Sequence, residues 1–201
     1  MNKRLLSILM MLLALSLFAA CGPAQPVTGD DIDPAPAAPE QTPEETARQF
    51  LELMLDDDRE LQLAILQNVT AVNAGMIDPS DEQREAMNET ALRLDGLLRD
   101  KFAALVSPDI LDKRIKDGSL MQYERLLGGA RAVAELSGCL FETKGDTVSF
   151  TAQVTCRVNG SQLGDSVPIK GEVEIGKDGL ITGFTVDSTG DLSRLLAQEV
   201  K

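Results

Sequence analysis

The chain of 201 residues contains no histidine and no tryptophan, and Tyr123 is its single tyrosine. The lack of histidine excludes the Ser-His-Asp triad, the Cys-His pair and every metal site built on imidazole. Basic residues are also few: 19 Lys and Arg stand against 32 Asp and Glu, giving a net charge of −13. Such a surface repels phosphate backbones, so nucleic acid is not expected as a partner. Carboxylate chemistry, lysine chemistry or no catalysis remains, and we predict no catalytic residue, cofactor or metal.

The first 20 residues have the order of a targeting segment. Lys3 and Arg4 form a basic start, residues 5–18 are apolar apart from two serines, and small residues precede Cys21. The apolar stretch is shorter than the roughly 20 residues of a spanning helix. The pattern resembles the signal peptide of bacterial lipoproteins, which implies cleavage before Cys21 and lipid attachment to it. A secretory signal cut after Ala20, or an uncleaved short anchor, are the alternatives.

Residues 21–41 are predicted to be a tether between the lipidated cysteine and a folded domain. This stretch holds five prolines, four acidic residues and few apolar side chains, so it cannot form a packed core. Removal of residues 1–20 would leave 17 basic and 32 acidic residues, a net charge of −15. The expected location is the extracytoplasmic side of the cell membrane, with lipid on Cys21 as the membrane contact.

Residues 42–201 are predicted to form one domain that begins with helices. Thr42 is a helix cap, Pro43 suits the first helical position, and Glu45 completes a capping box. Apolar residues at helical spacing predict further helices from Leu61 through Val69 to an end at Ala74-Gly75, and from a start at 78–82 through Met87 to Leu105. A short helix is expected after Ser107-Pro108, and another from a cap at Ser119 through Leu127 to an end at Gly128-Gly129.

The pattern then changes to a period of two residues, which is typical of strands. Residues 147–158 alternate apolar and polar side chains, and a turn at Gly145 joins them to a strand over about 132–143. Alternation continues through 167–175, a hairpin at 176–179 and 180–186, before a short final helix around 192–196. The predicted fold class is α+β, with N-terminal helices packed on a C-terminal antiparallel meander of about four strands.

Three features resemble the nuclear transport factor 2-like cone fold, as it occurs in uncharacterised lipoproteins of Gram-positive bacteria. They are the Thr42–Ala47 helix start leading into Phe50-Leu51 and an acidic turn, the tether before it, and Lys177-Asp178-Gly179 in the last hairpin. The resemblance implies helices over a curved sheet, an arrangement that often encloses a cavity.

Two cysteines remain beside Cys21. Outside the cytoplasm, an even pair such as Cys139 and Cys156 suggests a disulfide. A tight hairpin at Gly145, however, places Cys139 opposite Thr151 or its neighbour, whereas a disulfide needs Cα atoms within about 7 Å. A disulfide and two buried thiols therefore both remain open.

Methionine and aromatic residues at helical spacing are candidates for lining a pocket, although such residues more often form ordinary core. The set comprises Phe50, Met54, Met76, Met87, Phe102, Met121 and Tyr123.

We expect a non-enzymatic ligand-binding or protein-interaction module, with a small apolar ligand or an envelope protein as partner and an apolar cavity or the sheet face as contact site. A carboxylate-dependent enzyme is the alternative, and it requires a buried carboxylate with a raised pKa. A solute receptor for a transporter is a further alternative, although the chain is short for two lobes.

Overall fold

The structure is a computed structural model that describes residues 41–187 and 189–197. The predicted signal segment, the lipidation site Cys21 and the tether up to residue 40 lie outside the described residues. The described residues belong to one compact unit. Within the described ranges, no helix combines the length and the apolar character needed to cross a membrane.

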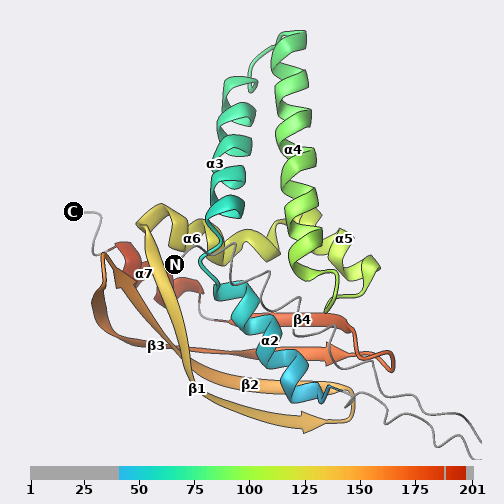
Figure 1. The fold of residues 1–201 in the computed structure, drawn as a ribbon, viewed down its shortest axis with the longest axis vertical. Helices are drawn as coiled ribbons and strands as arrows, with labels where there is room; N and C mark the ends of the chain where they lie inside the picture. Colours follow the sequence, from blue (N-terminus) through green and yellow to red (C-terminus); the bar gives the residue numbers. More distant parts are fainter. Residues whose placement is uncertain (1–40, 188, 198–201) are drawn as a thin grey trace, which may run out of the picture. The chain divides into compact units, whose positions relative to one another are not determined.

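The helices come first and the strands follow, which confirms the predicted α+β class (Figure 1). The elements are α2 (Pro43–Leu55), α3 (Arg59–Ala74), α4 (Asp81–Phe102), α5 (Pro108–Asp117), the 3-10 helix η2 (Ser119–Met121), α6 (Gln122–Ala130), β1 (Ala132–Lys144), β2 (Thr147–Val158), β3 (Ser161–Ile175), β4 (Ile181–Asp187) and α7 (Thr189–Ala197).

The four strands form one antiparallel sheet in the order β1-β2-β3-β4, as the alternating pattern predicts. The apolar side chains of β2 face the core and are at most 3% exposed: Val148, Phe150, Ala152, Val154 and Cys156. Strand β1 is interrupted between Ser137 and Leu140, where the register shifts and Gly138 has a φ of +58°. This bulge belongs to an edge strand, because only β2 pairs with β1.

Helix α2 lies against one face of the curved sheet (Figure 1). It begins with the predicted capping box, in which Thr42 and Glu45 satisfy each other's backbone N–H groups. Its Phe50 is completely buried, with ring centroids 4.8 Å from Phe184 of β4 and 5.9 Å from Phe102 of α4. These rings fill the space between helix and sheet, and we refer to α2 with the sheet as the body.

Helices α3 and α4 pack antiparallel as a helical hairpin that projects beyond the body (Figure 1). Asp58 caps α3 by accepting a hydrogen bond from Leu61 N at 3.0 Å, and Ser80 forms a capping box with Gln83 at the start of α4. The apolar residues buried in the core are confined to the base of the hairpin: Leu61, Ala64, Ile65, Leu94, Leu98 and Phe102.

The predicted end of α6 at Gly128-Gly129 is wrong, because the helix continues to Ala130 and ends at Arg131. Arg131 takes the left-handed conformation with a φ of +52°, and its N–H bonds to the Gly128 carbonyl at 3.2 Å. Gly128 has a packing role instead: a Cβ there would lie 3.1 Å from Gln62 Cγ. The glycine therefore allows α3 and α6 to approach, and does not stop the helix.

Candidate functional site

Two adjoining pockets of about 780 and 280 Å³ lie along one face of the hairpin. They share Asn68, Leu94 and Met121, and we call their combined surface the hairpin groove. Its walls come from α3, α4, α5, η2 and α6, and the remaining lining residues are Ile65, Val69, Val72, Asn73, Asn88, Ala91, Leu92, Asp95, Leu98, Asp112, Ile115, Lys116 and Arg125.

On α3, the groove follows an apolar stripe at a spacing of four and three residues. Ile65, Val69 and Val72 share one side of the helix at this spacing, and Met76 follows the helix end at Ala74. The exposed fractions rise along the stripe, from 7% through 36% to 40%, and Met76 beyond the helix is 73% exposed. The stripe thus starts in the core and continues outward to partly exposed positions.

A matching stripe on α4 borders the same groove. Ala91, Leu94 and Leu98 line the larger pocket, and Leu94 also lines the smaller one. Two antiparallel helices that present apolar rows to one side resemble half of a helical bundle, in which a further helix covers such a face. The hairpin groove therefore has the shape and spacing to accept a helix.

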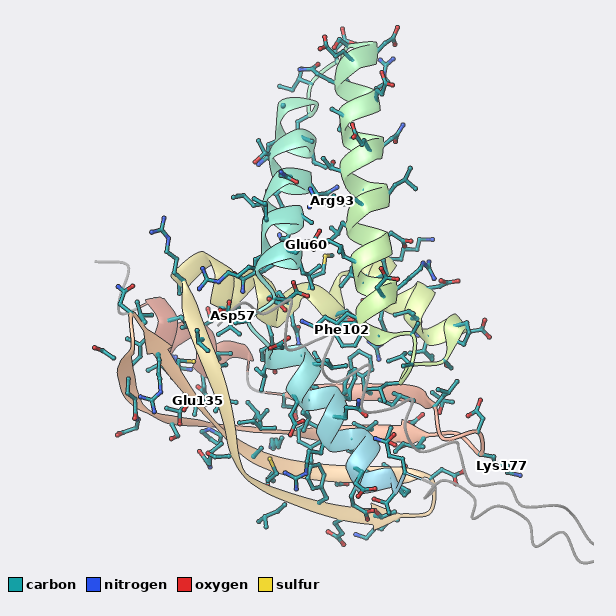
Figure 2. The ribbon with its side chains drawn as sticks, viewed as in Figure 1. Asp57, Glu60, Arg93, Phe102, Glu135 and Lys177 are labelled. Atoms are coloured by element: carbon teal, nitrogen blue, oxygen red, sulfur yellow. The ribbon has the colours of Figure 1, made fainter. Side chains whose placement is uncertain are left out.

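The charge of the hairpin is distributed unevenly. No charged residue occurs between Leu61 and Ile77, although the chain carries a net charge of −13. Residues 81–95 of α4, in contrast, hold five acidic residues and two arginines. One of these arginines, Arg93, crosses to Glu60 of α3 at 3.2 Å (Figure 2). By helical spacing, Asp81 and Glu85 continue the row of α4 residues that line the groove, so that edge is acidic.

The predicted methionine and aromatic pocket is wrong in its residues, because only Met121 of that set lines the hairpin groove. Phe50, Met54, Phe102 and Tyr123 are at most 1% exposed and belong to the core, and Met76 and Met87 lie on the hairpin outside the two pockets. Helical spacing of apolar residues does not by itself distinguish a groove from a core. The sequence signal for this groove is the absence of charged residues between Leu61 and Ile77.

A buried carboxylate lies at the base of the hairpin. Glu124 of α6 is 2% exposed, receives a hydrogen bond from Gln62 Nε2 at 3.2 Å, and forms an ion pair with Lys101 Nζ at 2.7 Å. Lys101 also lies 3.7 Å from Asp58 Oδ2. Burial raises the pKa of Glu124, and the hydrogen bond from Lys101 opposes this rise. The network joins α3, α4 and α6, and Glu124 lines neither pocket of the hairpin groove.

The two described cysteines are free thiols, so the disulfide considered between Cys139 and Cys156 is not formed. Cys156 is buried and lies opposite Ala134, whereas Cys139 lies in the β1 bulge, five residues farther along that strand. Five residues of strand span about 17 Å, well beyond disulfide reach. Burial raises the pKa of the Cys156 thiol, which makes it a poor nucleophile.

Among residues 41–187 and 189–197, no group of three or more acidic or cysteine side chains is arranged to hold a metal ion. The acidic turn after α2 is occupied by internal contacts instead. Asp58 caps α3, and the Asp57 carboxylate accepts hydrogen bonds from Arg59 Nε at 3.1 Å.

Comparisons with known proteins assign no family to this chain. No family model and no curated protein matches it. Among solved structures, the solution NMR structure of a de novo designed beta-sheet protein matches with 20% identity and a TM-score of 0.29. That match covers 65% of this chain and 89% of the designed chain. A likeness at this level supports no argument about fold or function, which must come from the residues themselves.

Proposed function

We propose that the chain is a membrane-anchored extracytoplasmic lipoprotein whose folded domain is a non-enzymatic protein-interaction module, with the hairpin groove as its binding site. The anchor rests on the N-terminal pattern that ends at Cys21. The interaction site rests on one observation: the α3 stripe leaves the core and continues along the groove, with Val69 36% and Val72 40% exposed. Apolar surface of this kind, next to pockets, is typical of docking sites.

The proposed occupant is an amphipathic helix of a partner protein, with lysine or arginine along one flank. An apolar row at heptad-like spacing would lie between the α3 and α4 stripes. On the acidic edge of α4, Glu85 would face the basic flank of that helix, while Asp81 and Asp95 already pair with Arg84 and Arg99. The side formed by α3 adds no charge between Leu61 and Ile77, whereas Lys116 of α5 and Arg125 of α6 add positive charge to the lining. A second copy of this acidic chain is disfavoured, because its own α4 would bring like charges together.

A nuclear transport factor 2-like domain remains part of this proposal, supported by a helix packed on a curved antiparallel sheet. Aromatic rings occupy the interior in which that fold often binds ligands, since Phe50 and Phe184 lie 4.8 Å apart there. We therefore assign binding to the hairpin groove and not to a small apolar ligand inside the cone.

The carboxylate-dependent enzyme remains the second candidate, because Glu124 is a buried carboxylate with a raised pKa. Its ion pair with Lys101 at 2.7 Å favours a structural role over acid–base catalysis. For a solute receptor, residues 41–187 and 189–197 offer a single core cluster and no second lobe.

The groove is tested with the full chain in nonionic detergent and a fluorescent 20-residue peptide that carries a leucine stripe flanked by lysines. We expect fluorescence anisotropy to show binding that Val72→Asp weakens at least tenfold. Leu66→Asp is the matched control: it adds the same charge to α3 at a residue that is 62% exposed and lines neither groove pocket. Equal loss of binding in the two variants would show attraction by charge alone and refute the groove.

Two further measurements test the alternatives. Sedimentation velocity of the same chain shows whether a dimer forms; a dimer that Val72→Asp dissociates would replace the partner helix by a second copy. For the anchor, Cys21→Ser is expected to move the protein from the membrane fraction to the soluble extracytoplasmic fraction. Unchanged membrane retention of that variant would contradict lipid attachment at Cys21.

A further inference from the structure

Apart from the hairpin groove, a pocket of about 500 Å³ lies beside the sheet and is lined by Arg59, Arg131, Val133, Arg157, Asn159 and Gly160. These residues come from five places in the chain: the start of α3, the end of α6, β1, the end of β2, and the turn before β3. We call it the arginine pocket. Its volume falls within the range of small-molecule sites, which is roughly 300–1,000 Å³. It brings together three of the ten arginines in residues 41–197 of an acidic chain.

Two of the guanidinium groups are held through Nε alone. Arg59 Nε lies 3.1 Å from both carboxylate oxygens of Asp57, and Arg157 Nε lies 3.1 Å from Glu135 Oε1. Figure 2 labels the two carboxylates, one at the turn before α3 and one on β1. Within the described residues, the terminal Nη atoms of Arg59 and Arg157 donate no hydrogen bond.

These contacts orient the two arginines through Nε and leave the terminal Nη groups available to a ligand. An exposed pair of this kind contributes little to stability, on the order of 0–1 kcal/mol. It does restrict the rotation of the guanidinium, because Nε is fixed. The two Nη groups of each arginine then remain free to donate in parallel to two oxygens of one anion.

Arg131 is the third arginine of the pocket, and its backbone conformation also supports a role in binding an anion. It occupies the left-handed position at the end of α6 with a φ of +52°, where glycine is the usual residue. Gly128 and Gly129 precede it, so glycine is present in this segment but not at the position that would benefit from it. No hydrogen bond or ion pair holds the Arg131 side chain within the part of the chain that the structure describes. A residue that holds an unfavourable backbone conformation, although its side chain bonds to nothing in the fold, is typical of a binding site.

We infer that the arginine pocket binds a phosphate group, on a free phosphate ester or on the headgroup of an anionic lipid. The three arginines carry three positive charges, and the Asp57 and Glu135 carboxylates that bond to two of them carry two negative charges. The pocket therefore has a net charge of +1 before a ligand binds. Tetrahedral phosphate offers enough oxygens for all three guanidinium groups, and Arg is the residue that best matches it. The pocket volume leaves room for an organic group attached to the phosphate. This site is distinct from the hairpin groove and does not depend on the function proposed for it.

The experiment titrates the full chain, in nonionic detergent, with two probes: inorganic phosphate and dihexanoyl phosphatidylglycerol below its micellar concentration. Binding is measured by calorimetry, and nitrogen-15 NMR follows the Nε–H signals of the arginines. We expect saturable binding that shifts the signals of Arg59, Arg131 and Arg157. Stronger binding of inorganic phosphate identifies a free phosphate as the ligand type, and stronger binding of the lipid probe identifies a headgroup.

Arg131→Gln and Arg157→Gln are each expected to weaken binding at least tenfold. Arg84→Gln is the matched control, because it removes the same charge from the hairpin, where Arg84 pairs with Asp81 at 3.1 Å. Arg131→Gly separates binding from folding: its melting midpoint should rise while its affinity falls. The inference is overturned if neither probe binds, if Arg84→Gln weakens binding as much, or if Arg131→Gly binds like the original chain.

Discussion

The body and the hairpin place their apolar residues in opposite situations. In the body, Phe50, Val148 and Val173 have no exposed surface, and aromatic rings fill the space between α2 and the sheet. In the outer hairpin, Leu66 is 62% and Ile77 is 91% exposed. Both regions have regular elements and well-capped helices, so the difference does not arise from local structure. It indicates that the body supplies stability and that the hairpin presents surface.

The largest effect expected from this comparison is on folding of the body. Phe50→Ala removes a completely buried ring that contacts Phe102 and Phe184, and should lower the free energy of unfolding by about 4 kcal/mol. Ile77→Ala at the hairpin tip should change it by less than about 0.5 kcal/mol. Urea denaturation followed by circular dichroism measures both. Similar values for the two variants would show that the hairpin is as tightly packed as the body.

At the base of the hairpin, where it joins the body, loss of one buried charge should lower the free energy of unfolding nearly as much. Lys101→Met leaves Glu124 buried without its ion-pair partner and should cost about 3 kcal/mol of unfolding free energy. The double variant Lys101→Met with Glu124→Leu should recover most of that loss, because no charge is then left buried. The same denaturation experiment tests both. If the double variant is no more stable than the single one, packing and not charge determines the stability of the junction.

The same junction predicts a pH dependence. Burial raises the pKa of Glu124 above its ordinary value of 4.5, so the folded chain binds more protons than the unfolded chain just above pH 4.5. Its contribution to stability is complete below pH 4.5 and is lost as the pH rises through the raised pKa. Hydrogen bonds lower the pKa values of Glu44 and Glu45, and their contributions change below pH 4.5, in a separate window.

The test is to measure the melting midpoints of the original chain and of Glu124→Gln at increasing pH, starting from pH 4.5. The original chain should lose stability over this range, and the variant should lose less because its side chain does not titrate. Equal slopes for the two proteins would mean that Glu124 is ionised throughout, held by Lys101.

The smallest effect concerns the helix end next to the arginine pocket. Arg131→Gly removes the cost of a left-handed backbone in the folded chain, about 1–2 kcal/mol. It also gives the unfolded chain more conformational freedom, which lowers the free energy of unfolding by about 0.5–1 kcal/mol. The net expectation is a gain of roughly 0.5–1 kcal/mol in unfolding free energy. Denaturation by urea provides the measurement. A loss of stability would show that the arginine side chain contributes to the fold itself.

The elements with local signals could be predicted from the sequence. The Thr42 cap, the Pro108 helix start and the alternation of β2 depend on neighbouring residues, and the structure has all three. The end of α6 could not, because Gly128 is retained for contact with Gln62, which lies 66 residues earlier. A glycine kept for packing and a glycine that stops a helix look alike in sequence.

The sites were harder to predict for the same reason. The arginine pocket joins Arg59 to Arg131 and Arg157, which are distant in the chain and become neighbours only when α6 packs on α3 and β2 pairs with β1. The hairpin groove was predictable only in part. The spacing of Ile65 and Val69 indicates a helix. Whether that side of the helix is exposed depends on which other elements pack against it, and this is not visible in the sequence.

The bulge in β1 has a consequence for the chain in crowded surroundings. Both β1 and β4 are edges of the sheet, and β1 is 13 residues long, enough to serve as a template for a strand from another copy. The shift between Ser137 and Leu140 and the left-handed Gly138 interrupt the row of free backbone groups along that edge. Strand addition would therefore lose its register partway along β1. The bulge therefore works against long edge-to-edge pairing through β1 when copies collide.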